Sequence, residues 1–341
     1  MPALDLVTGG CGFIGRNLVR SLLDAGRAVR VYDCVDPCAL PPGAEFRHGS
    51  ILDPGALSQA MDGVERVYHL AGVSHLWAPD RAAFLRVNAM GTEHLLAAVP
   101  HGVRVIHCST EAILLVGSRD GAPVRGDVLP AFDRMPGPYT RSKWLAEWAA
   151  LAAAEAGRDV VIASPTVPVG PEDWNMTPPT TMLSLFLNGH APAFLDCVLN
   201  LVDVRDAADG LRLVGERGRA GQRYVLGGEN LPLRQLLSRL ERRSGRTMPS
   251  CALPGSVALT VAALAEWTAD HVLRRPPAAT REGVRLALAS VPLDDGKARS
   301  ELGYRPRPID EALALAASWL MGCAGSSVGR LAPEGPTRLL P

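Results

Sequence analysis

The sequence predicts an α/β fold built on a doubly wound parallel sheet. Through the first 165 residues, short apolar runs alternate with helical patterns, and several of the runs are continuously apolar. Continuous apolar runs are typical of parallel strands that are covered on both faces, and their alternation with helices is typical of a doubly wound sheet. We expect strands at 3–8, 28–33, 66–71, 104–108 and 160–164, and helices at 13–24, 54–61, 81–99 and 139–156.

The first strand runs directly into T-G-G-C-G-F-I-G at 8–15, and an amphipathic helix follows at 16–24. A strand, a glycine turn and a helix place backbone N–H groups and the positive end of a helix dipole against a diphosphate. Gly9 permits the tight turn, Gly12 lets a pyrophosphate approach the backbone, and Gly15 lets the helix pack closely on the strand. This order predicts a dinucleotide site on a Rossmann-type sheet.

The second strand ends in Asp33. An acidic side chain at this place accepts hydrogen bonds from the adenosine ribose and repels a 2′-phosphate, which predicts NAD rather than NADP. The alternative is an aspartate that only serves a turn, because Asp36 and Pro37 nearby also favour a turn.

The rest of the chain divides around this site. We expect the Rossmann domain at 1–165, a smaller C-terminal α/β substrate-binding region at 166–321 that begins in a proline-rich stretch, and a disordered tail at 322–341. Two later runs, 200–204 and 222–227, either rejoin the main sheet or form a small sheet of their own.

Charge and cysteine use exclude several classes of partner. The chain has 35 basic and 35 acidic residues among 341, without a Lys/Arg run, so no nucleic-acid partner is expected. Its seven scattered cysteines do not form a disulfide framework, and Cys34 and Cys38 have no second pair to complete a metal site. Since signal-peptide and membrane-span patterns are absent, we expect a cytoplasmic protein without a metal or a membrane span.

Tyr139 and Lys143 open the helix expected at 139–156 and lie one turn apart on one face. A free tyrosine has a pKa of about 10, and a nearby ammonium group stabilises the phenolate. We therefore predict that Lys143 lowers the pKa of Tyr139 toward the range useful for proton transfer. Ser109 and Thr110 follow the strand at 104–108, at the edge of the sheet where ligands bind. Either hydroxyl can hold a substrate oxygen beside Tyr139.

These motifs together resemble the extended short-chain dehydrogenase/reductase superfamily, whose marks are T-G-x-x-G-F-I-G, a Ser/Thr after a later strand, and Y-x-x-x-K. The resemblance covers 3–320. Further strings resemble the hopanoid-associated sugar epimerases, which are relatives of dihydroflavonol reductases and 3β-hydroxysteroid dehydrogenases. These strings are H-L-W-A-P-D (75–80), Y-T-R-S-K-W-L-A-E (139–147), S-P-T-V-P-V-G-P (164–171), N-L-V-D-V (200–204) and Y-V-L-G-G-E-N (224–230).

The resemblance implies a role for each site residue. Tyr139 is implied as the catalytic base, Lys143 as the group on the nicotinamide ribose, and Thr110 as the hydroxyl partner, with Ser109 in reserve. Glu111, His75 and Asn88 are implied on the substrate side, and Asn88 supports the site from its helix. The implied cofactor-binding residues are Gly9, Gly12, Phe13, Ile14, Gly15, Asp33, Asp53, Ala71, Gly72, Tyr139, Lys143, Pro165 and Thr166.

Three positions depart from the family pattern. Ser50 stands where the family usually has an aspartate that contacts adenine, and Asp33 stands where the hopanoid-associated group often has arginine. Glu111 replaces a small or apolar residue. Sugar-nucleotide 4,6-dehydratases carry T-D-E where this chain reads T-E-A at 110–112, so one of their two extra acids is missing and dehydration is not expected.

The segment at 255–267 is apolar around most of its circumference. A core or lid helix is the first interpretation, and the alternatives are a cover over a lipid-like substrate or a peripheral contact with a membrane surface. A sugar nucleotide would instead need cations for its diphosphate, for which Arg205, Arg281 and Arg285 are available.

The helix after Tyr139 carries an apolar stripe that has two interpretations. In a lone chain this stripe is a core face, whereas family members commonly pair this helix and its predecessor across a dimer interface, which implies a homodimer. The stripe consists of Trp144, Trp148, Leu151 and Ala152.

The resemblance implies an NAD-dependent enzyme that acts on a small molecule, a sugar or a polycyclic or lipid alcohol. Tyr139 would take a proton from a secondary alcohol while its carbon delivers hydride to nicotinamide. The family strings favour a sugar epimerase, and a 3β-hydroxysteroid, carboxysterol or other lipid-alcohol dehydrogenase, or a ketone reductase, fits the apolar segment at 255–267 equally well. A non-catalytic nucleotide sensor is the alternative of another class, against which Tyr139, Lys143 and Thr110 argue.

Overall fold

The computed structural model describes residues 3–36, 40–117 and 122–325. Its main sheet has seven parallel strands in the order β3-β2-β1-β4-β5-β6-β9. The strands are β1 (Leu4–Thr8), β2 (Ala28–Asp33), β3 (Glu45–His48), β4 (Val64–His69), β5 (Arg104–Cys108), β6 (Val160–Pro165) and β9 (Arg223–Leu226). The strand order reverses beside β1, where nucleotides bind in such sheets, and the predicted Rossmann-type fold is confirmed.

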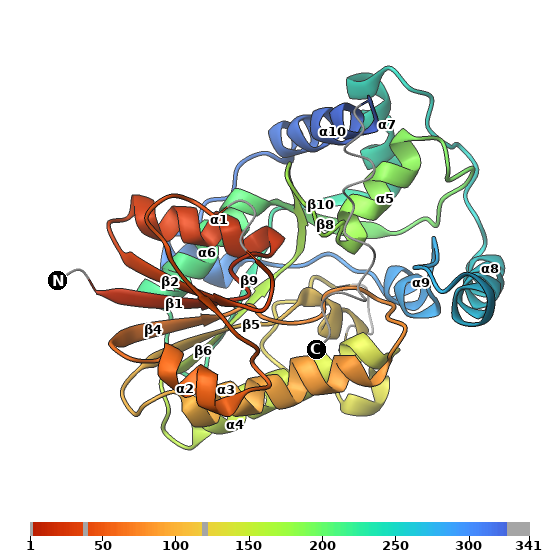
Figure 1. The fold of residues 1–341 in the computed structure, drawn as a ribbon. Helices are drawn as coiled ribbons and strands as arrows, with labels where there is room; N and C mark the ends of the chain where they lie inside the picture. The colour runs from red at the N-terminus through yellow and green to blue at the C-terminus, as the bar shows by residue number, and fades with distance from the viewer. Residues whose placement is uncertain (1–2, 37–39, 118–121, 326–341) are drawn as a thin grey trace.

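Helices cover both faces of the main sheet (Figure 1). One face carries α1 (Phe13–Asp24) and α6 (Val204–Arg217), and the other carries α2 (Pro54–Ala60), α3 (Gly91–Ala98) and α4 (Pro138–Glu155). Because both faces are covered, every residue of β6 is buried, which explains the continuous apolar runs.

A second, smaller sheet organises the later part of the chain. It contains β7 (Val167–Val169), β8 (Val198–Asp203) and β10 (Glu229–Pro232), with β8 parallel to β7 and antiparallel to β10. The helices α5 (Pro178–Leu187), α7 (Leu233–Ser244) and α10 (Ile309–Gly325) share one apolar core with it. The pair α8 (Gly255–Thr268) and α9 (Arg281–Leu288) lies on the side away from the main sheet (Figure 1).

Short helical turns complete the described elements. They are η1 (Phe84–Met90), η2 (Glu111–Ile113), η3 (Leu115–Gly117), η4 (Phe132–Arg134), η5 (Ala269–Leu273) and η6 (Ala298–Leu302). Within the described residues, no helix is long and apolar enough to cross a membrane, and no group of three or more His, Cys, Asp or Glu side chains could hold a metal ion.

Several elements differ from the expectations. The sequence did not predict β3, because only Phe46 is apolar in this exposed edge strand. The helix expected at 81–99 begins as the π-helical η1 and becomes regular only at Gly91, where a side chain would clash with Ile51. The two later runs separate: one forms β8 in the second sheet, and the other returns to the main sheet as β9.

Residues 322–325, expected to belong to a disordered tail at 322–341, are helical. The helix α10 continues to Gly325, because an apolar face that includes Ala312, Ala316 and Leu320 packs in the second core and carries the helix past Gly322. The remainder, 326–341, lies outside the described residues.

Candidate active site

The glycine loop between β1 and α1 is packed against its neighbours at two positions and open at a third. Gly9 has a φ of 72°, and a side chain there would meet the backbone nitrogen of Ala71 at 2.6 Å. A methyl group on Gly15 would overlap the carbonyl oxygen of Gly9. At Gly12 a methyl group would meet only that same oxygen, at 3.2 Å. The loop is therefore open where a pyrophosphate is predicted to approach.

The first turn of α1 and the end of β2 complete this cradle. Phe13 and Ile14 open the helix, where backbone N–H groups have no partner within the helix and can bind an anion. Asp33 accepts hydrogen bonds from the backbone nitrogens of Cys11 at 2.9 Å and Val35 at 3.1 Å. Burial raises the pKa of Asp33, and these N–H groups oppose the rise. The residues present therefore fit a dinucleotide.

The loop after β3 carries two side chains that serve the loop itself. Asp53 is exposed and caps α2, accepting hydrogen bonds from the backbone nitrogens of Gly55 at 3.0 Å and Ala56 at 3.1 Å. Ser50 accepts a hydrogen bond at its hydroxyl oxygen from Leu52 N at 3.2 Å. The cofactor contact of Asp53 stays a prediction.

Asn88 connects the segment after β4 to α4, the helix that carries Tyr139. Its Oδ1 accepts from Val73 N at 2.7 Å, and its Nδ2 donates to Val73 O at 3.1 Å and to Ser142 Oγ at 2.9 Å. Ser142 precedes Lys143 on α4. Asn88 is buried and its amide is occupied within the protein, so it holds the segment at Val73 against α4, and its place on the substrate side stays a prediction.

Tyr139 and Thr110 meet at the carboxyl end of β5. Tyr139 lies in the first turn of α4, is 9% exposed, and shares a side-chain hydrogen bond with Thr110. The ring of Phe84 packs edge-on against Tyr139, with 6.4 Å between the centroids. The structure thus brings together the predicted base and a hydroxyl group.

The pKa of Tyr139 moves in the opposite direction to the prediction. Burial raises it, the charges of Glu111 and Glu282 raise it further, and the hydrogen bond with Thr110 lowers it. Lys143 donates from Nζ to the carbonyl oxygen of Cys108 at 2.7 Å, and burial lowers the pKa of Lys143. Lys143 is therefore held on a backbone carbonyl rather than on the phenol.

Glu111 places a titratable carboxyl group behind Thr110. Thr110 donates from Oγ1 to Glu111 Oε2 at 3.1 Å. Burial raises the pKa of Glu111 to about 7, although hydrogen bonds from Thr110 and from backbone N–H groups oppose the rise. Glu111 therefore changes charge near neutral pH, one hydrogen bond from the hydroxyl that contacts Tyr139.

Ser109 belongs to a different network. Its hydroxyl donates to Glu147 on α4, and Glu147 also accepts hydrogen bonds from Arg223 on β9. All three side chains are buried. The structure therefore assigns the hydroxyl beside Tyr139 to Thr110, and it assigns Ser109 to a structural ion-pair network that ties α4 and β5 to the last strand of the sheet.

The segment that follows β6 and β7 closes against the glycine loop. Pro165 and Thr166 are buried at the end of β6, and Thr166 N donates to Leu226 O at 3.2 Å. Farther on, Arg16 donates to the carbonyl oxygen of Glu172, and the His75 ring lies 3.0 Å from Asn175 O. His75, implied on the substrate side, therefore holds this segment.

The same segment contains strained backbone. Glu172 and Met176 have φ values of 65° and 46°, left-handed conformations that are costly for residues other than glycine. Such strain clusters at functional sites. The sequence carried no signal for these two residues, because neither is a glycine and their segment meets Arg16 of α1 and His75 only in the folded chain.

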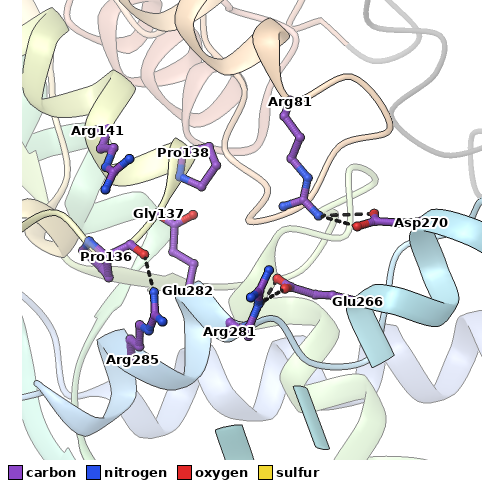
Figure 2. A pocket seen from close by; sticks show the side chains of 10 residues that line it. All are labelled: Arg81, Pro136, Gly137, Pro138, Arg141, Glu266, Asp270, Arg281, Glu282 and Arg285. Atoms are coloured by element: carbon purple, nitrogen blue, oxygen red, sulfur yellow. Dashed lines mark hydrogen bonds and ion pairs between the residues drawn. The ribbon is translucent and has the colours of Figure 1, made fainter. Parts of the chain in front are cut away.

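A pocket of about 430 Å³ lies between the start of α4 and the α8–α9 pair (Figure 2). Tyr139, Thr110 and the glycine loop do not line it, so it is separate from the predicted nucleotide site. Two ion pairs cross or flank it, Arg81–Asp270 at 3.1 Å and Arg281–Glu266 at 2.6 Å. Its lining residues are Arg81, Pro136, Gly137, Pro138, Arg141, Glu266, Asp270, Arg281, Glu282 and Arg285.

Glu282 is a site residue that the sequence analysis missed. From α9 it reaches the start of α4, where its carboxylate accepts hydrogen bonds from Thr140 N at 2.8 Å, Thr140 Oγ1 at 2.7 Å and Tyr139 N at 3.2 Å. Gly137 makes room for it, because any side chain there would overlap the carboxylate. No spacing pattern connects residues so far apart in the chain.

Known proteins share this chain's sequence and structure over most of its length. The sequence profile of the NAD dependent epimerase/dehydratase family matches residues 6–227. A Synechocystis sp. protein that carries the name dihydroflavonol 4-reductase is 36% identical, covering 92% of this chain and 93% of the relative. Sterol demethylase protein B of Methylococcus capsulatus is 32% identical, covering 92% and 97%. The crystal structure of gox2253 matches with a TM-score of 0.80 at 34% identity, covering 94% and 98%. The chain therefore belongs to the NAD-dependent epimerase/dehydratase family and is an enzyme of the short-chain dehydrogenase/reductase type.

Proposed function

We propose that the protein interconverts a secondary alcohol and a ketone on a polycyclic or lipid-like substrate, using NAD. The observation that carries this proposal is the buried Tyr139–Thr110 pair at the carboxyl end of β5. In the oxidation, the phenolate oxygen of Tyr139 takes the proton of the substrate hydroxyl while Thr110 aligns that oxygen. Gly12, the start of α1 and Asp33 would hold NAD, and the bound cofactor would supply the hydride acceptor for this oxidation.

Glu111 gives the Thr110 hydroxyl a direction. When Glu111 is ionised, it accepts the hydrogen bond donated by the Thr110 hydroxyl, which leaves Thr110 Oγ1 as an acceptor for the substrate hydroxyl or for protonated Tyr139. When Glu111 is protonated, this preference is lost. Because the pKa of Glu111 is about 7, the orientation of Thr110 depends on pH near neutrality.

Three arginines considered for a sugar nucleotide are already engaged, which supports the lipid-like substrate. Arg205 pairs with Asp203 at 2.6 Å, Arg281 pairs with Glu266 at 2.6 Å, and Arg285 donates to a backbone carbonyl oxygen at 3.0 Å. The relatives named for a dihydroflavonol and a sterol also support it. Sugar epimerisation is the second candidate, favoured by the strings at 139–147 and 164–171. In either case 166–321 is proposed as the substrate-binding region.

The test combines a substrate panel with one variant. Purified enzyme is assayed for NADH formation with sterol and flavanol alcohols, and for epimer formation with nucleotide sugars. Tyr139→Phe should lower turnover by about 10²–10⁴-fold, because the proton acceptor is gone, while calorimetry shows unchanged NAD binding. Tyr68→Phe, at a buried tyrosine of β4, is the matched control and should keep its activity.

The outcomes separate the candidates. Full turnover by Tyr139→Phe would overturn the mechanism. Turnover of nucleotide sugars alone, with NAD retained at near-stoichiometric amounts and released only by acid, would identify the epimerase. NAD binding without turnover of either substrate group would overturn both proposed substrate classes.

We also propose that the protein is a homodimer in the cytoplasm. Trp148 on α4 is 56% exposed, and Leu85 and Met90 on the adjacent η1 are exposed as well. These side chains lie on the two elements that family members commonly pair across a dimer. The seven scattered cysteines, whose spacing forms no disulfide framework, support a reducing compartment.

A further inference from the structure

Exposed large apolar side chains gather on α8 and the η5 turn that follows it. Val257, Val261 and Leu264 lie on successive turns of one face of α8, and the side chain of Leu264 is 65% exposed. A monomer rarely leaves such a stripe uncovered without a partner. The exposed apolar residues of this segment, named here the α8 face, are Val257, Val261, Leu264, Trp267, Val272 and Leu273.

The acidic side chains of residues 255–275 are paired within the protein, whereas the basic ones are exposed. Glu266 is buried beneath the α8 face and bonded to Arg281, and Asp270 is bonded to Trp77 and Arg81. Residues 255–275 contain no other acidic side chain. The end of the segment carries His271, Arg274 and Arg275, all exposed. The α8 face is therefore apolar along its length and basic at one end.

We propose that the α8 face binds the surface of a lipid bilayer that contains anionic lipids. An exposed apolar helix face with a tryptophan and with basic residues at one end can lie in the plane of a bilayer surface, with its apolar side chains among the acyl chains. Charge complementarity favours an anionic lipid surface as the partner. Arg274 and Arg275 attract anionic headgroups, and the acidic residues of the segment are paired within the protein.

The α8 face is connected to the catalytic helix through short contacts. Asp270 accepts a hydrogen bond from Trp77 Nε1 at 2.8 Å, in the segment that follows β4. Glu266 holds Arg281 at the start of α9, and the next residue, Glu282, holds the backbone of Tyr139. Docking would therefore place the start of α4 near the bilayer. The proposal does not rest on the proposed reaction, because binding requires no turnover.

The test is sedimentation of the full chain with vesicles of phosphatidylcholine alone and of phosphatidylcholine mixed with phosphatidylglycerol. We expect binding to the mixed vesicles that weakens as salt rises. Leu264→Glu should weaken it by about tenfold or more, because it removes an inserted side chain. Arg274→Gln and Arg275→Gln should each weaken binding to the mixed vesicles by about fivefold. Val128→Glu, at an exposed apolar residue outside the α8 face, is the matched control and should bind like the wild type.

Circular dichroism and NAD binding establish that each variant is folded. Absence of wild-type binding to the mixed vesicles, or equal binding by Leu264→Glu, would overturn the proposal. Sedimentation velocity adds a further check: if Leu264→Glu converts a dimer to a monomer and the wild type ignores vesicles, the α8 face is a contact between copies of the chain and the proposal is wrong.

Discussion

Two carboxylates, Glu282 and Glu111, place negative charge near Tyr139, the proposed base, and raise its pKa. Glu282 is 4% exposed and bonds to the backbone of Tyr139 and Thr140. Its negative charge is one of the causes that raise the pKa of Tyr139. A carboxylate at the start of a helix also stabilises the orphan N–H groups and the helix dipole there. Glu282 therefore has a structural effect and an electrostatic effect, and the two can be separated.

We predict that Glu282→Gln shifts the pH dependence of turnover. Removal of the charge lowers the pKa of Tyr139, so the rise of kcat with pH in alcohol oxidation moves to lower pH. The variant also loses about 1–3 kcal/mol in the free energy of unfolding, because the amide nitrogen is a poor partner for backbone donors. A profile of kcat against pH tests the shift, and urea denaturation tests the loss of stability. Glu241→Gln, at an exposed glutamate, is the control for both measurements. An unshifted profile would leave Glu282 with a structural role alone.

Glu111 predicts a pH dependence of stability. Its pKa is about 7 in the folded protein, above the ordinary 4.5, so the folded state holds its proton to higher pH than the unfolded chain does. The free energy of unfolding therefore falls as pH rises from 4.5 to 7, by up to about 3 kcal/mol. Glu111→Gln should remove this fall and be more stable than the wild type at about pH 8. Urea denaturation across this range is the measurement. Glu93→Gln, on the surface of α3, should keep the wild-type pH dependence, and an unchanged slope in Glu111→Gln would contradict the assignment.

At the scale of elements, the junction of β1 and α1 must satisfy packing and ligand binding at once. Gly15 is needed by the packing, because a methyl group there overlaps Gly9 O. Gly12 is less constrained, since a methyl group there would make a tight contact at 3.2 Å with Gly9 O instead of an overlap. The late strand β9 lies in the main sheet, where the buried Arg223–Glu147 ion pair holds it in addition to its pairing with β6.

Two alanine variants distinguish these roles. Gly12→Ala should keep its melting temperature close to the wild type but lose at least about tenfold in NAD affinity, because the methyl group occupies the path of the pyrophosphate. Gly15→Ala should lose about 1–3 kcal/mol of stability, because the contact forces the backbone apart. Thermal unfolding and calorimetric titration measure the two effects. Equal loss of stability in both variants would show that Gly12 is needed by the fold alone.

At the scale of the whole molecule, long-range side-chain contacts hold the later part of the chain against the elements of the main sheet. Glu282 connects α9 to α4, and His75 and Arg16 fasten the segment at 172–175. These contacts leave the outer side of α4 and η1 exposed. Trp148 stacks on Trp144, with 6.4 Å between ring centroids, and its ring faces outward.

Trp148→Glu should convert the proposed homodimer to a monomer. A buried charge opposite its own symmetry copy is strongly unfavourable in an isologous interface. Sedimentation velocity measures the mass, and Val128→Glu should remain dimeric. A wild-type protein that sediments as a monomer would contradict the prediction, as would a dimer that survives Trp148→Glu.

Local patterns were enough to predict much of this protein. Apolar runs and glycine spacing predicted the parallel sheet, the helix at 13–24 and the cradle at Gly9, Gly12 and Gly15, because these features depend on neighbours within a few residues. The helical pattern at 139–156 likewise predicted the helix that carries Tyr139, the proposed base. The edge strand β3 was not predicted, because its sequence has no apolar pattern.

Tertiary packing decided what local patterns left open. It chose Thr110 over Ser109, because Glu147 and Arg223 take up the Ser109 hydroxyl. It reversed the expected direction of the Tyr139 pKa, because burial and two carboxylates outweigh a lysine that is bonded to Cys108 O. It also brought Glu282 of α9 to the start of α4, where it accepts a hydrogen bond from Tyr139 N. Burial and long-range contact exist only once the chain is folded, so no spacing along the sequence could reveal them.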